Sequence, residues 1–130
     1  MKLAIVLSIA GCVVALAGPA HAGQTIASST IYGAFNQDTA ECIVRNVGKS
    51  PTTVDVNIFD ESGNPLSGGG NCAAPILPGD YCFKRAPISS GVAYACSATP
   101  PGSARDLRAN FVLIDDLGSD ETPLRSVVLR

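Results

Sequence analysis

Residues Thr52–Phe59 read TTVDVNIF, and this alternation of apolar and polar side chains decides the fold class. Val54, Val56 and Ile58 are apolar, and in an extended chain every second side chain points to the same side. The polar residues between them point to the other side, which is typical of an antiparallel sheet with one buried and one solvated face. The pattern therefore predicts a half-buried β-strand.

The same alternation recurs along the chain between clusters of turn residues, and no convincing helical period accompanies it. The predicted strands are Thr25–Tyr32, Thr39–Val47, Thr52–Phe59, Tyr81–Arg85, Val92–Ala98, Leu107–Ile114 and Leu124–Leu129. Strands of this kind, about seven in all, predict an all-β protein with two packed antiparallel sheets. We expect residues 23–130 to form one such β-sandwich domain.

The first 22 residues predict a signal peptide. A basic start precedes the apolar run Leu3–Ala17, and Ala20–Ala22 is a small-x-small cleavage site. Cleavage would remove His21, the single histidine of the chain, on which most acid–base and metal chemistry near neutral pH depends. We therefore expect an exported protein, periplasmic or secreted, with no transmembrane segment after cleavage and no cofactor. A lipoprotein anchored through Cys12 is a less favoured alternative, because the apolar run continues past that residue.

The charge pattern excludes one class of partner. The chain carries 9 basic and 11 acidic residues, a net charge of −2, and the basic residues are scattered along the sequence. Nucleic-acid binders carry a concentrated basic face. We therefore expect no nucleic-acid partner, and the sequence leaves open whether the partner is a protein or a glycan.

Four cysteines remain after the predicted cleavage, and an even count in a small exported domain indicates disulfides. Cys42 and Cys96 lie on the apolar sides of two predicted strands, so they can face each other across a sandwich core. Tyr94 precedes Cys96 by two residues, as in the tyrosine corner of immunoglobulin domains. We therefore pair Cys42 with Cys96, which leaves Cys72 with Cys82. The spacings lack the close pairs of a zinc site.

Two runs resemble a known class of domain. Residues 42–48 and 51–63 are similar to the N-x-G and V-x-V-x-I-x-D-x-x-G run of bacterial exported immunoglobulin-like sandwich domains. Leu77–Asp80 and Tyr94–Cys96 fit the same layout, and the resemblance extends over residues 40–115. It implies an immunoglobulin-like two-sheet sandwich. It implies no activity, because such domains share an architecture and no catalytic residues.

Acidic residues supply the candidates for metal binding and catalysis. One loop gathers four carboxylates, which are weak calcium candidates because calcium takes oxygen ligands. These residues are Asp115, Asp116, Asp120 and Glu121. Their spacing differs from that of a helix–loop–helix calcium site, so a solvated charged loop is the alternative interpretation. The same cluster, or Asp60 with Glu61, would have to supply the acids of a small acid-dependent hydrolase.

The sequence therefore predicts an exported β-sandwich with a non-enzymatic binding or structural role. We expect its contacts on the loops Gly68–Cys82 and Asp115–Pro123, because loops on a rigid sandwich carry recognition. The alternatives are an inhibitor of a secreted enzyme that presents the Cys72–Cys82 loop, and the acid-dependent hydrolase. Arg108 is expected to face outward and to pair with an acid on a neighbouring strand, and an arginine that contacts a ligand is the alternative.

Overall fold

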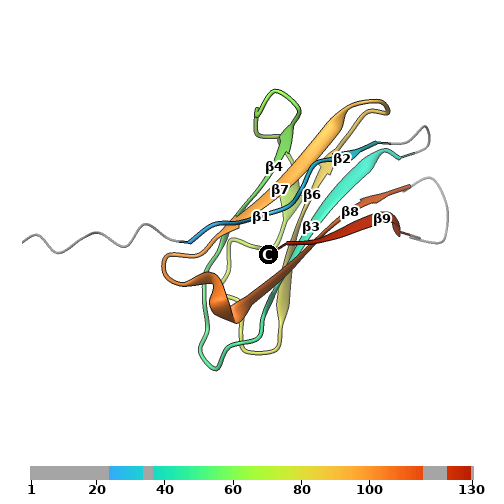
Figure 1. Ribbon diagram of the computed structural model, residues 1–130. Coiled ribbons are helices and arrows are strands. Elements are labelled where there is room, and N and C mark those ends of the chain that lie inside the picture. Colours follow the sequence, from blue (N-terminus) through green and yellow to red (C-terminus); the bar gives the residue numbers. More distant parts are fainter. Residues whose placement is uncertain (1–23, 34–36, 116–122, 130) are drawn as a thin grey trace, which may run out of the picture.

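The protein is a sandwich of two antiparallel sheets (Figure 1). The computed structural model describes residues 24–33, 37–115 and, for the backbone, 123–129. In the four-stranded sheet, β7 is central, β4 pairs with one of its edges, and β1 and β2 pair with the other. These strands are β1 (Ile26–Ala27), β2 (Ile31–Tyr32), β4 (Asp55–Asp60) and β7 (Ala93–Thr99).

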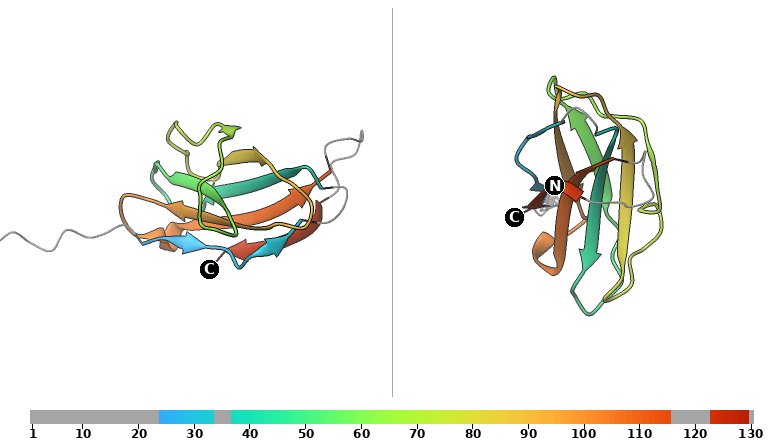
Figure 2. Two further views of the ribbon diagram at one scale, coloured as in Figure 1. Left: turned by 90° about the horizontal axis from the view of Figure 1, so that it is seen from above. Right: turned by 90° about the vertical axis from the view of Figure 1, so that its right-hand side faces the viewer.

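The second sheet has five strands in the order β5-β6-β3-β8-β9. They are β3 (Thr39–Asn46), β5 (Gly69–Gly70), β6 (Tyr81–Pro87), β8 (Leu107–Ile114) and β9 (Pro123–Leu129). A short 3-10 turn, η1 (Ala104–Asp106), precedes β8. Strands β4 and β6 come from different sheets and contact each other at one side of the sandwich. Figure 2 shows the two sheets from two further directions.

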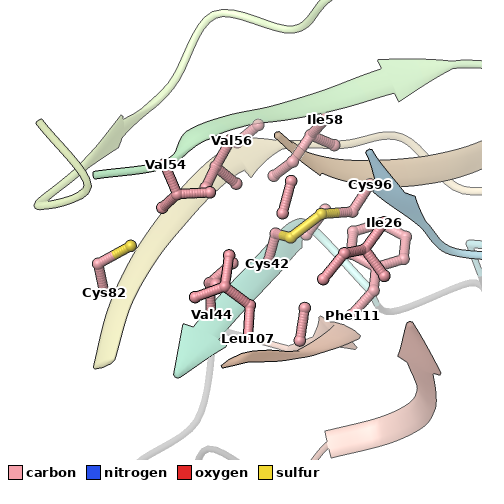
Figure 3. Close-up of a cluster of buried hydrophobic side chains, with 14 of the residues drawn as sticks. Ile26, Cys42, Val44, Val54, Val56, Ile58, Cys82, Cys96, Leu107 and Phe111 are labelled. Atoms are coloured by element: carbon pink, nitrogen blue, oxygen red, sulfur yellow. A yellow bond between two sulfur atoms is a disulfide. The ribbon is translucent and has the colours of Figure 1, made fainter. Parts of the chain in front are cut away.

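The core lies between the two sheets (Figure 3). Val54, Val56 and Ile58 are all buried, as their alternation predicts, and Phe111 of β8 is fully buried opposite them. The Cys42–Cys96 disulfide crosses the middle of this core and joins β3 to β7, with 6.2 Å between the two Cα atoms.

The second disulfide joins Cys72 to Cys82, with 5.0 Å between the two Cα atoms. It connects the glycine-rich segment to β6 near the margin of the sandwich. Both pairs are those that the sequence predicts.

Several strand ends differ from the prediction by one or two residues, and three larger differences occur. The predicted strand Thr25–Tyr32 is split into β1 and β2, because Ser28 Oγ accepts the backbone N–H of Cys96 at 2.8 Å and takes the place of a ladder partner. Strand β4 begins at Asp55, while Thr52 forms an isolated bridge to Ile76. The glycine-rich segment, which is not among the predicted strands, contributes β5 to the five-stranded sheet.

Tyr94 closes a corner of the kind that the sequence indicates. Its hydroxyl oxygen accepts the backbone N–H of Ser89 at 2.8 Å, and the hydroxyl lies 3.3 Å from the Ser89 carbonyl oxygen, to which it donates. The connection after β7 differs from that of an immunoglobulin domain, where the last strand pairs with the strand carrying the second cysteine. Here β8 pairs with β3, which carries the first cysteine, Cys42.

Two glycines of the glycine-rich segment, Gly68 and Gly70, lie directly against the backbone of β6. A Cβ atom on Gly70 would overlap the carbonyl oxygen of Phe83, and one on Gly68 would overlap that of Arg85, whereas a Cβ on Gly69 would meet nothing within 4 Å. These contacts explain why positions 68 and 70 are glycine.

Replacing Gly70 with alanine is therefore expected to destabilise the protein by about 1–3 kcal/mol, because backbone atoms must move to admit the methyl group. Gly69→Ala is the matched control, with an expected change within about 0.5 kcal/mol. Urea unfolding followed by far-UV circular dichroism gives both values. Equal costs for the two variants would contradict this packing.

Candidate functional site

A cleft opens along the outer edge of β4. The chain crosses this edge at two points, through the bridges Thr52↔Ile76 and Phe59↔Pro65. Between these points the segment carrying the three glycines follows β6 instead of β4. The space left between the two sheets is a cleft of about 700 Å³, which is within the range of small-molecule sites in proteins.

The walls of the cleft come from four segments. They are residues 53–56 of the β4 edge, the glycine segment with Cys72 and Ala73, Phe83 and Lys84 of β6, and Thr99–Pro101 after β7. Most of this lining is apolar or backbone. The Cys72–Cys82 disulfide holds the glycine wall to β6, so the width of the cleft depends on that covalent connection.

Lys84 is the unexpected residue of this site. It lies directly opposite Cys42 in the β3–β6 ladder, and residues directly opposite each other point to the same face of a sheet. Lys84 therefore starts from the core-facing side of β6, flanked by the buried Cys82 and Ala86. An ammonium group at such a position is costly unless it has partners.

The partner of Lys84 comes from the opposite sheet. Its Nζ donates to Asn57 Oδ1 at 3.3 Å, and Asn57 Nδ2 donates to Asp55 Oδ2 at 2.9 Å. These three side chains form a polar chain from β6 around the edge of β4, because Asp55 and Asn57 lie on the polar side of that strand. An ammonium group has three donors, and one of them is used by Asn57. The cleft can therefore hold a ligand that offers an acceptor to Lys84 and an apolar part to the walls.

Sequence reasoning missed Lys84 and Asn57. The signal that could have found them is the position of Cys82: once its sulfur is placed inward, the alternation of an extended chain puts Lys84 inward too. The predicted contact loop Gly68–Cys82 does contribute to this site, because Gly68–Gly70 and Cys72 line the cleft.

The tip of the Cys72–Cys82 loop, predicted as an inhibitory segment, has one anchored and one exposed apolar residue. Ile76 is buried, and its N–H and carbonyl groups both bond to Thr52, at 2.7 and 3.1 Å. The next residue, Leu77, is 55% exposed. Inhibition of a secreted enzyme through this loop stays a prediction.

Of the carboxylates named for a hydrolase, Asp60 and Glu61 lie in the described part of the chain and both contact backbone N–H groups. Asp60 closes the turn after β4, and its Oδ1 accepts the backbone N–H groups of Ser62 and Asn64, each at 2.9 Å. The pKa of Asp60 is lowered, chiefly by the N–H of Asn64 and next by the Asn64 side chain. A carboxyl group with a lowered pKa is a poor general acid. Glu61 lies 3.5 Å from the backbone N–H of Ala93.

The predicted calcium loop is described only at its first residue. Asp115 follows β8 and is half-buried, while Asp116, Asp120 and Glu121 lie outside the described residues. Within the part of the chain that the structure describes, no group of three or more potential metal ligands occurs. The described residues also form no helix long and apolar enough to cross a membrane.

The expected acidic partner of Arg108 is not present on β3. Arg108 faces outward as predicted and is exposed, but the residue opposite it on β3 is Arg45. Its Nη1 donates instead to the carbonyl oxygens of Arg105 and Leu107, at 2.8 and 2.7 Å. The order of strands in the sheet, which alternation does not specify, places the two arginines side by side.

Comparison with known proteins supports the fold and adds nothing about activity. No family model matches the sequence, and no curated protein matches it. Among solved structures, the fold is similar to the crystal structure of Thermotoga maritima 1070, with a TM-score of 0.50. The match has 10% sequence identity and covers 84% of this chain and 94% of that chain. At this identity the similarity shows the fold alone.

Proposed function

We propose that this chain is an exported, non-enzymatic binding protein whose ligand occupies the cleft between β4 and the glycine segment. The observation that carries the proposal is the position of Lys84. Its side chain leaves β6 on the side that faces the core, and it lines the cleft. Lysine contributes little to an apolar core, so its placement here is better explained by an acceptor that arrives from outside.

The composition of the cleft suggests the class of ligand. Among the described lining residues, Lys84 is the one cation and Asp55 is the one carboxylate. Val54, Val56 and the proline pair supply the apolar surface. The ligand we propose is a small amphipathic molecule with one anionic group and an apolar body. Two disulfides in a small domain favour an oxidising compartment, which supports export.

Replacing Lys84 with methionine tests this proposal. Methionine keeps most of the apolar stem and removes the charge, so the fold should persist. We use anilinonaphthalene sulfonate, a fluorescent anion with an apolar ring system, as the probe. We expect saturable binding to the wild-type protein and at least about tenfold weaker binding to Lys84→Met, which corresponds to the loss of one charge-assisted hydrogen bond.

Two controls make the result specific. Lys49→Met removes an exposed lysine outside the cleft lining and should leave the probe affinity unchanged. Anilinonaphthalene without the sulfonate group should bind the wild-type and Lys84→Met proteins equally. Equal loss in both lysine variants, or binding of the sulfonate probe that does not depend on Lys84, would refute the proposal.

A further inference from the structure

A row of three side chains lies on the outer face of the five-stranded sheet, away from the cleft. Arg45 of β3 lies directly opposite Arg108 on one side and directly opposite Tyr81 of β6 on the other. Residues directly opposite each other share a face, with their Cβ atoms about 4.5–5.5 Å apart. We call Arg108, Arg45 and Tyr81 the arginine row.

The two arginines are placed unfavourably for the isolated chain. Like charges directly opposite each other on neighbouring strands destabilise a sheet. Arg45 Nε donates to the carbonyl oxygen of Gly79 at 3.0 Å, and Arg108 Nη1 donates to two carbonyl oxygens. Among the described residues, neither guanidinium group has a carboxylate partner. Both keep N–H donors for an external acceptor.

Another arginine on the same face, Arg85, has a carboxylate partner within the sheet. Arg85 lies opposite Glu41 on β3 and forms an ion pair with it. It also lies over the ring of Phe83, 5.4 Å from the ring centre. Within the described part of the chain, Arg45 and Arg108 thus differ from Arg85 in having no carboxylate partner.

Exposed apolar side chains lie beside the arginine row. Tyr81 is 61% exposed. Val47 and Leu77 are also large apolar residues with about half of their surface exposed. Hydrogen bonds from Gly79 N to Asn46 O and from Asp80 N to Leu77 O hold these segments next to the end of β3. Tyrosine and arginine are the residues that most often dominate protein–protein binding energies.

We propose that the arginine row binds an acidic segment of a partner protein, with a carboxylate of that segment held between Arg45 and Arg108. The planar guanidinium group binds carboxylates through paired hydrogen bonds. An apolar side chain next to the carboxylate packs on Tyr81, with Val47 and Leu77 extending the contact. The charge of the row and the apolar surface beside it together favour a polypeptide over a sulfated glycan.

The test uses the full protein and an N-acetylated hexapeptide of alternating glutamate and phenylalanine. Arg45→Gln and Arg108→Gln should each weaken binding by at least about tenfold, measured by isothermal titration calorimetry. Arg105→Gln is the matched control, because Arg105 is an exposed arginine with its own acidic neighbour, Asp106, at 3.6 Å, and it should leave the affinity unchanged. The affinity of the wild-type protein should fall as salt is added.

Further measurements distinguish an acidic peptide from the other molecules that this surface could bind. A hexapeptide with glutamine in place of glutamate should not bind. Tighter binding of a heparin tetrasaccharide, or self-association that disappears in Arg45→Gln, would overturn the proposal in favour of a sulfated glycan or a second copy of this chain. If a glutamine variant unfolds, Arg45→Lys and Arg108→Lys replace it and should still weaken peptide binding, because lysine lacks the paired donors. An unchanged affinity in these folded variants would also overturn the proposal.

Discussion

Replacing both Cys42 and Cys96 with alanine is expected to lower the free energy of unfolding by about 4 kcal/mol. The disulfide closes a loop with a sequence separation of 54 residues, and the chain-entropy model assigns a larger stabilisation to a longer loop. Both cysteines are also fully buried between the sheets, so the variant loses packing in addition to the cross-link. The free energy of unfolding of a small domain is about 5–15 kcal/mol, so this one change removes a large part of the stability.

The second disulfide provides the comparison. The Cys72–Cys82 bridge has a sequence separation of 10 residues, and its double alanine variant should cost about 2.7 kcal/mol in the same model. Because the chain contains no tryptophan, urea unfolding is followed by far-UV circular dichroism. A larger cost for Cys72→Ala/Cys82→Ala than for Cys42→Ala/Cys96→Ala would contradict the central role of the core disulfide.

Asn46 is the most deeply buried polar side chain among the described residues, with 1% of its surface exposed. Its Nδ2 donates to the carbonyl oxygens of Ser50 and Ile76, at 2.8 and 3.0 Å, and its Oδ1 accepts the N–H of Gly48 at 2.9 Å. One amide group therefore connects the end of β3, the following turn and the tip of the Cys72–Cys82 loop.

Asn46→Ala should lower the free energy of unfolding by about 3 kcal/mol, because it leaves the half-buried N–H of Gly48 and the carbonyl groups of Ser50 and Ile76 without their side-chain partner. Asn64→Ala is the control. Asn64 is exposed and its side chain donates one hydrogen bond, to Asp60 at 3.2 Å, so we expect a cost below about 1 kcal/mol. Comparable losses from both variants would show that the buried amide has no special role.

Asn46→Asp adds a dependence on pH. A carboxylate cannot donate to the carbonyl groups of Ser50 and Ile76, and burial favours its protonated form, so its pKa in the folded protein should be raised. The variant should therefore be least damaged below the pKa of an unfolded aspartate, about 3.9. Its deficit relative to wild type should grow as the pH rises through the folded pKa. A deficit that shrinks with rising pH would contradict this assignment.

The features that the sequence predicted well are those encoded locally. Strand β8 has the predicted bounds, Leu107–Ile114, because alternation and flanking turn residues specify it without reference to the rest of the chain. Both disulfide pairs were also predicted, since Cys42 and Cys96 share faces with apolar neighbours. The turn residues Pro100–Gly102 likewise separate β7 from η1 and β8.

The features that could not be predicted depend on which strands become neighbours. The pairing of Arg45 with Arg108 exists because β8 lies beside β3, and alternation within a strand carries no information about its neighbours. Strand β5 consists of two glycines, so it has no side-chain pattern to recognise. The inward position of Lys84 conflicts with its polarity, and this conflict between local preference and global fold is typical of functional positions.

The short glycine strand β5 also covers the β6 edge of the five-stranded sheet. An uncovered margin offers unpaired N–H and carbonyl groups to any extended chain and invites aggregation. Gly69 and Gly70 pair with the backbone of β6. They have no side chains that could interdigitate with those of another sheet, as in a steric zipper. The Cys72–Cys82 disulfide holds β5 against β6. Reduction of this disulfide is therefore expected to promote aggregation through the exposed edge of β6, in addition to lowering the stability.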